Sequence, residues 1–352
     1  MLALIPLLVP VVLSGAAFAS LASVKISAPL ANFSLTIGDA AAQNCFPALG
    51  FKMPSAVPSS TNNWWCDQST EYAFLGFSYE VTACQSRGQL IADFANIRKQ
   101  FNGRYVRMYG ACDRDGFYDD IVEAAWEAGI GVHALIWFGF DGGNIWQARC
   151  DSLVNSLWSN PKAKFVTRVV QFGSEPMFDS VLSVGNLAAH IWDLKGKIAA
   201  LGIPITVSEM AYGYTKNNGA LPVMSAIDII DAHMLPFFAQ DASTATQAWP
   251  IVTRDVEWFI QNGQGKKLIL SQNGWPSVSY PGVEANSAAA VADVQNENDY
   301  FNLLDFECSY FKTLPGGVGW FAHIYSDSQE PGYGILGTNG QPKFNFNPRT
   351  SC

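Results

Sequence analysis

The chain has 352 residues, of which 49% are hydrophobic, 13% aromatic and 14% charged, and eleven are tryptophan. This length suits one large domain, since α/β barrels commonly occupy about 200 to 300 residues as a single unit. The formal net charge of −9 argues against nucleic acid or an anionic membrane as a partner. Low charge with many aromatic rings suits an uncharged polysaccharide, although a core alone could use the rings.

The first residues have the pattern of a secretory signal, residues 1–19. The stretch 2–13 is almost entirely apolar, and Ala17-Phe18-Ala19 forms a small-x-small cleavage pattern before Ser20. The apolar stretch is too short to span a bilayer comfortably, and residues 345–352 are polar, so we expect neither a membrane span nor a lipid anchor. The sequence therefore predicts a secreted or cell-wall protein, and we expect a monomer.

Seven cysteines are spread along the chain: Cys45, Cys66, Cys84, Cys112, Cys150, Cys308 and Cys352. Outside the cell most of them should form disulfides, and the odd number leaves at least one thiol unpaired or intermolecular. None stands in a C-x-x-C spacing, so we expect no zinc or redox site. The sequence predicts no metal and no cofactor.

Residues 20–70 lack periodicity and include a Ser/Pro-rich piece, which predicts a linker or a loosely packed N-terminal extension. Beyond them, short apolar runs alternate with amphipathic helical stretches. The candidate strands are 73–78, 105–109, 131–137, 165–172, 204–208, 227–233, 267–271 and 317–324. Eight alternating strand and helix units predict a (β/α)₈ TIM barrel over residues 71–352. A doubly wound open sheet is the alternative, but no G-x-G-x-x-G supports dinucleotide binding.

Polar side chains follow several of these strands, and the carboxyl ends of barrel strands carry active sites. The run L-S-Q-N-G-W-P-S places Gln272 and Trp275 at such an end, and the run V-Q-F-G-S-E-P places Ser174 and Glu175 at another. A glutamate beside a buried strand is costly unless it has a partner or a function. The alternative is that Glu175 only caps the following helix.

Two further runs add candidates. The run V-R-M-Y-G directs Arg107 and Tyr109 to one face, because strand side chains alternate. Arg107 would hold a neighbouring carboxylate ionised, or it is paired structurally inside the barrel. The run D-A-H-M-L-P-F-F puts His233 at a strand terminus, which favours a site over the packing role that is usual for a lone histidine.

In their order along the chain, these runs resemble motifs of glycoside hydrolase family 17, the β-1,3-glucanases and glucanosyltransferases of plants and fungi. They match the family's V-R-L-Y-G, V-G-N-E, N-x-Y-P-[FY] and I-S-E-T-G-W-P-S, and the chain closes with a similar E-x-x-x-G-L-F and K-P-K-F segment. The resemblance covers about residues 72–344. It implies a barrel that acts on β-glucan, with Glu175 as general acid/base, and it puts Ser174 and His233 where the family has asparagines.

At the position of the family's nucleophile stands Gln272, whose amide is a poor nucleophile and cannot offset an oxocarbenium charge. Retaining glycosidases need a second carboxylate ~5–5.5 Å from the first, and inverting ones need it ~6.5–9.5 Å away. Glu209, which ends the fifth strand, is a candidate inverting base, or else it binds a sugar hydroxyl or forms an ion pair. Asp327 and Glu330 follow the eighth strand at the same face.

Two functions remain open. One is a secreted glycoside hydrolase or transglycosylase that acts on cell-wall β-glucan, and the other is an inactive barrel that binds it. The predicted catalytic positions are Glu175, Gln272 and Glu209. The predicted substrate-binding residues, whose aromatic members are either stacking platforms or core, are Arg107, Tyr109, Trp137, Ser174, His233, Phe237, Trp275 and Trp320.

Overall fold

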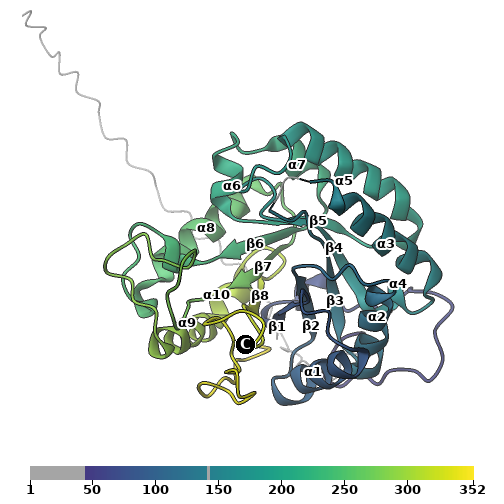
Figure 1. The fold of residues 1–352 in the computed structure, drawn as a ribbon, viewed down its shortest axis with the longest axis horizontal. Helices are drawn as coiled ribbons and strands as arrows, with labels where there is room; N and C mark the ends of the chain where they lie inside the picture. The colour runs from purple at the N-terminus through teal and green to yellow at the C-terminus, as the bar shows by residue number, and fades with distance from the viewer. Residues whose placement is uncertain (1–43, 141–142) are drawn as a thin grey trace, which may run out of the picture. The chain divides into compact units, whose positions relative to one another are not determined.

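The computed structural model describes residues 44–140 and 143–352, so the expected signal segment lies outside the described residues. Eight parallel strands close into a barrel in chain order (Figure 1). They are β1 (Ala73–Glu80), β2 (Tyr105–Tyr109), β3 (Gly131–Ile136), β4 (Thr167–Ser174), β5 (Ile205–Glu209), β6 (Ile230–Met234), β7 (Leu268–Asn273) and β8 (Gly319–Ala322). The predicted (β/α)₈ barrel is confirmed, and each predicted strand overlaps an observed one.

One or two α-helices follow each of the strands β1 to β7 and surround the barrel (Figure 1). They are α1 (Arg87–Gln100), α2 (Phe117–Ala128), α3 (Ile145–Ser159), α4 (Ala163–Val166), α5 (Val184–Ile198), α6 (Ala211–Thr215), α7 (Leu221–Ala226), α8 (Trp249–Asn262), α9 (Val294–Phe306) and α10 (Cys308–Thr313). Short 3₁₀ turns are η1 (Gln68–Thr70), η2 (Ala199–Leu201), η3 (Pro236–Phe238) and η4 (Ala245–Gln247). Helix crossovers of this kind are what parallel neighbouring strands require.

The barrel interior is filled in layers of side chains. An apolar layer is formed by Leu75, Tyr105, Val169, Ile229, Ile269 and Phe321. Because strand side chains alternate, the next inward positions lie two residues further along, and on β2, β4 and β6 they are Arg107, Gln171 and Asp231, all buried. The apolar layer therefore closes the barrel below a polar layer that faces the carboxyl ends of the strands.

The outer faces of the strands pack against the apolar faces of the helices. On α2 the buried positions include Ile121, Val122 and Ala125, and on α8 they include Val252 and Val256. These residues recur at the three- and four-residue spacing of an amphipathic helix. This packing forms the large core between the strands and the helices.

Residues 44–70 pack against α4, which directly precedes β4, and against the end of α2. Phe46 and Trp64 are buried in the main core, and the Trp64 indole N–H donates to the carbonyl of Phe165 at 2.6 Å. Trp64 also stacks on Trp126, with ring centroids 6.0 Å apart. The low-periodicity sequence of residues 44–70 thus supplies large apolar side chains that the barrel buries.

Three disulfides join Cys45 to Cys66, Cys84 to Cys112 and Cys308 to Cys352. Among the described residues, which include all seven cysteines, Cys150 is the unpaired one, and it is buried. The expectation that most cysteines pair and one is left over is confirmed.

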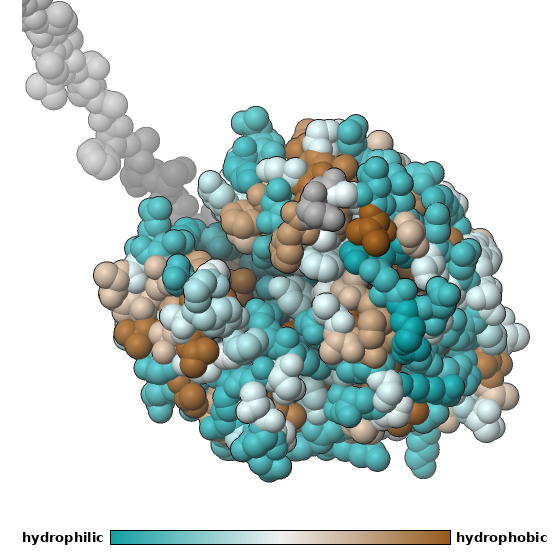
Figure 2. All heavy atoms as spheres, in the orientation of Figure 1, coloured by the Kyte–Doolittle hydropathy of each residue, from teal (hydrophilic) through white to brown (hydrophobic). Residues whose placement is uncertain are grey.

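In residues 44–140 and 143–352, no helix is both long and apolar enough to cross a membrane. On the face of the molecule in Figure 2, hydrophobic residues form small separate groups within a mostly polar surface.

Candidate active site

The predicted site residues on β2, β4, β6 and β7 meet at the carboxyl ends of the strands. The register of β6 and β7 places His233 opposite Gln272, and that of β4 and β5 places Ser174 opposite Ser208. Arg107 projects into this group from β2 and contacts all four of these residues. The structure thus brings together residues that are up to 165 positions apart in the sequence.

Arg107 is fully buried at the centre of the site and has five hydrogen-bonding partners. They are Oε1 of Gln171 (2.8 Å), Oε1 of Gln272 (2.9 Å), Oγ of Ser208 (3.0 Å), Oγ of Ser174 (3.1 Å) and Nε2 of His233 (3.2 Å). Burial lowers the pKa of Arg107 to about 10, so the guanidinium stays charged at neutral pH. Among the described residues, its direct partners are all neutral groups, and Gln272 contributes an amide oxygen.

Glu175 is held by His233, whose Nδ1 lies 2.6 Å from Oε1 of the carboxyl group. Arg107 can only donate, so Nε2 of His233 accepts, and the Ser208 hydroxyl lies 2.6 Å from the same nitrogen. The ring proton therefore resides on Nδ1 and is donated to Glu175. Burial lowers the pKa of His233, which keeps the ring neutral at neutral pH.

The hydrogen bond from His233 also sets the charge of Glu175. Burial on its own raises the pKa of Glu175, but that hydrogen bond and the positive charge of Arg107 bring it below its ordinary value of 4.5. Glu175 is therefore a carboxylate at neutral pH. Its side chain is 22% exposed and so reaches the mouth of the barrel.

The backbone at Glu175 is unusual for a glutamate, with φ at +55° in the left-handed region. Its N–H donates to the carbonyl of Ser208 on β5 at 2.7 Å. This hydrogen bond extends the pairing of β4 with β5 by one residue beyond the end of β4. A strained backbone of this kind persists only where surrounding contacts hold it, and such positions cluster at functional sites.

Glu209 supplies those contacts from β5. Its carboxylate is fully buried and accepts hydrogen bonds from the backbone N–H groups of Met177 (2.8 Å), Phe178 (3.0 Å) and Met210 (2.9 Å). Burial and, after it, the negative charge of Glu175 raise the pKa of Glu209 to about 8, despite these three donors. The Glu209 side chain thus fastens the turn after β4.

Tyr109 and Trp137 are both half-buried at the rim. The Arg107 guanidinium lies 5.4 Å from the Tyr109 ring, which links this tyrosine to the central cluster. Trp137 lies against Arg149 and packs edge-on against Phe140, whose side chain is 79% exposed. Both predicted contact residues are therefore open to solvent on one side.

The other three predicted aromatic platforms are core residues. Phe237 and Trp275 have no exposed surface, and Trp320 is 1% exposed. Trp275 packs edge-on against Phe237, and its indole N–H donates to the carbonyl of Val291 at 2.9 Å. Their expected role in stacking on sugars is corrected, because the surrounding helices and loops cover the rings.

Three residues of the site did not enter the sequence prediction, namely Gln171, Ser208 and His323. Gln171 and Ser208 bind Arg107, and Nε2 of His323 lies 3.0 Å from Oε2 of Glu330, a carboxylate that the sequence places at this face. Alternation along β4 could have identified Gln171, since it lies two residues beyond the inward Val169. No sequence spacing predicts the contact between His323 and Glu330, because the conformation of the loop after β8 brings the two side chains together.

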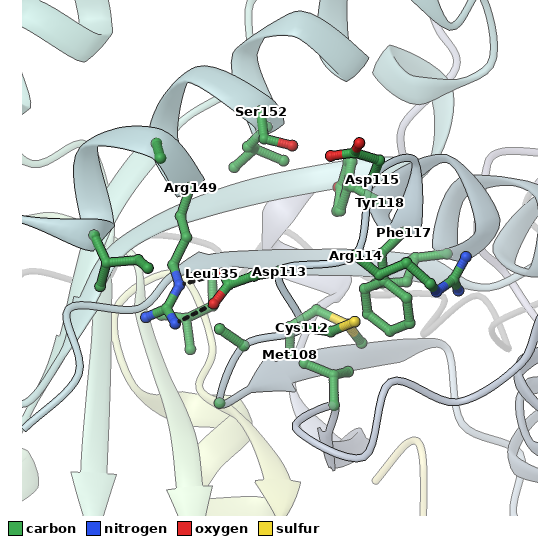
Figure 3. A pocket seen from close by; sticks show the side chains of 17 residues that line it. Met108, Cys112, Asp113, Arg114, Asp115, Phe117, Tyr118, Leu135, Arg149 and Ser152 are labelled. Carbon is green, nitrogen blue, oxygen red and sulfur yellow. Dashed lines mark hydrogen bonds and ion pairs between the residues drawn. The ribbon is translucent and has the colours of Figure 1, made fainter.

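A separate pocket of about 220 Å³ lies outside the barrel, between α2, α3 and the loop after β2 (Figure 3). It contains the ion pair of Arg149 with Asp113, at 2.7 and 2.8 Å, and its floor includes Met108 and Leu135. Neither Glu175 nor any partner of Arg107 lines it, so it is not part of the strand-end site. No group of His, Cys, Asp and Glu suited to a metal ion occurs among the described residues.

Comparison of the sequence with known proteins gives a match to the BtgE/BtgC glycoside hydrolase domain over residues 75–332. Two curated relatives, both named probable β-glucosidase btgE, come from Aspergillus terreus and Aspergillus clavatus and are 25% and 24% identical over 251 and 245 residues. The alignments cover 67% of this chain but 43% and 41% of the relatives. The chain thus matches less than half the length of these relatives.

The fold is similar to that of a glycoside hydrolase family 17 β-1,3-glucanosyltransferase from Rhizomucor miehei, with a TM-score of 0.63, 20% identity, and coverage of 80% of this chain and 99% of that chain. An active-site mutant of the Rhizomucor enzyme in complex with laminaritriose gives the same values. An endo-laminarinase from Formosa has a TM-score of 0.59 at 14% identity, with coverage of 78% and 85%. Since the matching domain covers more than half of the chain, this protein belongs to the BtgE/BtgC glycoside hydrolase family.

Proposed function

We propose that this protein cleaves glycosidic bonds of cell-wall β-glucan outside the cell, with Glu175 as the general acid/base. The observation that carries the proposal is the position of Glu175, at the end of β4 on a left-handed backbone, hydrogen-bonded to His233 and open to the mouth. A protein that only binds an uncharged glucan has no need of a carboxylate held in this way. The β-glucan substrate follows from the Rhizomucor and Formosa neighbours, and the three disulfides suit an extracellular protein.

The proposed chemistry begins with proton transfer from Glu175 to the glycosidic oxygen. That role requires the protonated form of Glu175, whose pKa lies below 4.5, so the enzyme should work best in acid. Gln272 occupies the place of a family 17 nucleophile in this proposal. With its oxygen bound to Arg107, its amide N–H groups are left to donate to a sugar hydroxyl.

The second candidate function is a catalytically impaired barrel that binds glucan in the cell wall. The neutral Gln272 beside the buried Arg107 favours it, since neither group can act as a nucleophile or offset a developing positive charge. The carboxylate of Glu175, held by His233 at the mouth, favours the enzymatic function.

One experiment separates the two functions. Purified protein is incubated at acid pH with laminarin and with β-1,6- and mixed-linkage glucans, release of reducing sugar is measured, and binding to the insoluble polymers is measured in parallel. We expect hydrolysis of laminarin by the wild type, its loss in Glu175→Gln, and no change in Glu284→Gln, which alters an exposed carboxylate. Binding without release of sugar, equal in all three proteins, would establish the binding function instead.

A further inference from the structure

Most aromatic rings of this barrel fill the core, so the few that stay exposed need another explanation. In residues 44–140 and 143–352, the exposed aromatic side chains are Phe140, Trp158, Phe178, Trp192, Tyr212 and Phe306. Two of them, Phe178 and Tyr212, contact each other and follow the neighbouring strands β4 and β5. These two residues are called the rim pair below.

The rim pair presents two ring surfaces at an angle to each other. The ring centroids are 6.1 Å apart and the ring planes make an angle of 64°, so the contact is edge-on. Lys216 holds Phe178, because its Nζ donates to the Phe178 carbonyl at 2.6 Å and lies 5.2 Å from the centre of the ring. Phe178 is nevertheless 39% exposed and Tyr212 60% exposed. The rings are thus held in place with apolar surface open to solvent, which is what stacking on a sugar requires.

One buried side chain fixes both segments that carry the rim pair. The carboxylate of Glu209 accepts a hydrogen bond from the N–H of Phe178 at 3.0 Å and another from the N–H of Met210 at 2.9 Å. Met210 directly precedes α6, which carries Tyr212. The same carboxylate fastens the turn after β4, so the rim pair and Glu175 belong to one rigid part of the mouth.

Two charged side chains flank the rim pair. Asp179 follows Phe178 in the chain, and its N–H donates to the carbonyl of Glu175 at 2.9 Å. Burial and, after it, the negative charge of Glu175 raise the pKa of Asp179 to about 6, while the positive charge of Lys216 opposes this rise. Asp179 therefore lies within electrostatic reach of both groups. A carboxyl group and an ammonium group beside two apolar rings suit the hydroxyls and C–H faces of an uncharged sugar.

The role of Glu175 as general acid indicates which part of a glucan chain would reach the rim pair. The proton goes to the glycosidic oxygen, and that oxygen stays with the leaving part of the chain. The leaving part therefore begins at the Glu175 carboxyl group. Phe178 is three residues further along, so its Cα lies at most about 11 Å from that of Glu175. The next units of the leaving part are then the ones within reach of the rings.

We propose that the rim pair is a binding platform for the leaving part of a β-glucan chain. The assignment rests on the proposed function, which defines the bond that is cleaved. Sugar faces stack on the rings of Phe178 and Tyr212, and Asp179 and Lys216 bind the hydroxyl groups at their edges. Because the ligand is uncharged, this stacking depends little on salt.

The first test measures affinity for laminaripentaose by isothermal titration calorimetry, in a Glu175→Gln background that prevents cleavage. Phe178→Ala and Tyr212→Ala should each weaken binding about two- to tenfold, which corresponds to one aromatic contact. Their melting temperatures should stay close to that of the background, because both side chains lie at the surface. Phe178→Tyr keeps the ring and should keep the affinity.

Phe306→Ala is the matched control, because Phe306 is 76% exposed but lies away from the mouth. Its neighbour Asp305 binds Arg349, whose carbonyl accepts a hydrogen bond from the N–H of Phe74 near the start of β1. This control should bind laminaripentaose like the background. If both alanine variants of the rim pair bind as tightly as the control, the platform is overturned. Should Phe178→Ala not fold, the variant at Tyr212 decides by the same measurement.

The second test locates the platform relative to the cleaved bond. The leaving part keeps the reducing end, so laminaripentaose with deuterium at its reducing-end C1 marks that part, and mass spectrometry identifies the labelled fragments. With Glu175 intact, the double variant Phe178→Ala/Tyr212→Ala should hold the leaving part less well and shift the label toward shorter fragments. A shift toward longer labelled fragments, or no shift, overturns the assignment to the leaving part.

The outcomes separate this proposal from the proposed function. A wild type that cleaves none of the glucans overturns the proposed function and, with it, the assignment to the leaving part. The affinities then still decide whether the rim pair binds glucan. A wild type that cleaves laminarin, together with alanine variants of the rim pair that bind like the control, overturns the platform alone.

Discussion

At the scale of single residues, the site is governed by a buried cation that has no direct anionic partner in the part of the chain that the structure describes. Arg107 is surrounded by neutral oxygens and one imidazole nitrogen, and Gln272 supplies one of those oxygens. A buried charge is tolerated only when hydrogen bonds replace its hydration, and five partners do so here. The negative charges that act on Arg107 from a greater distance include Asp231, Glu175 and Glu330.

Gln272→Glu should create a retaining glycosidase or greatly raise its activity. The new carboxylate would lie beside Arg107, which keeps it ionised, and it could attack C1 and offset the developing positive charge. We expect the kcat for laminarin to rise roughly a hundredfold or more, with the β-anomer as first product. Reducing-sugar kinetics and NMR measure both. Unchanged kcat and unchanged product configuration would contradict Gln272 as the replaced nucleophile.

His233→Phe should shift the pH dependence of activity upward. The His233 N–H favours the ionised form of Glu175, so its loss raises the pKa of Glu175, and the protonated acid then persists to higher pH. A hydrogen bond to a charged group contributes about 1.5–3 kcal/mol, so the descending limb of the kcat profile should move up by about one to two pH units.

His190→Phe on α5 serves as a control for the loss of an imidazole far from the strand ends, and it should keep the wild-type profile. A His233→Phe profile that coincides with that control would show that His233 does not set the protonation of Glu175.

At the scale of elements, the turn after β4 determines whether Glu175 reaches the mouth. The buried Glu209 on β5 binds two N–H groups of this turn, so one strand positions the functional residue of its neighbour. Space around that carboxylate is limited, since a Cβ added to Gly213 would lie 2.3 Å from its Oε1. This requirement explains the glycine at position 213 in α6.

Glu209→Gln tests the positioning role. The amide N–H₂ of the glutamine would face backbone N–H donors and could not accept their hydrogen bonds. This mismatch should destabilise the fold by about 1–3 kcal/mol. It should also lower kcat about tenfold while KM changes little, because Glu175 is displaced. Thermal unfolding and steady-state kinetics measure these effects. Gly213→Ala should show the same pattern, because it displaces the same carboxylate. Complete loss of activity in Glu209→Gln with wild-type stability would instead assign Glu209 as the catalytic base.

At the scale of the whole barrel, large aromatic side chains fill the shell between strands and helices. Trp275 is the clearest case, because the turn after β7 directs its ring inward, against Phe237. Residues 44–70 extend the same shell with Trp64 and Phe46 near the start of β4. Much of the 13% aromatic content is therefore structural.

Trp275→Ala should lower stability and leave sugar binding intact. Removing a fully buried indole creates a cavity, which costs about 3–5 kcal/mol, and the melting temperature should fall accordingly. Titration of laminari-oligosaccharides into the folded protein should give wild-type affinity. Lost affinity with an unchanged melting temperature would instead show that the Trp275 ring contacts the bound sugar.

The sequence by itself determined the barrel, because eight short apolar runs alternating with amphipathic stretches can bury both kinds of surface in that arrangement. It also determined which polar residues stand at strand ends, since Arg107, His233 and Gln272 occupy fixed steps from buried strand positions. The tertiary structure alone decided which rings are covered, where the Glu209 side chain points, and that His323 lies beside Glu330. Those features depend on contacts between distant segments, whose packing no local periodicity specifies.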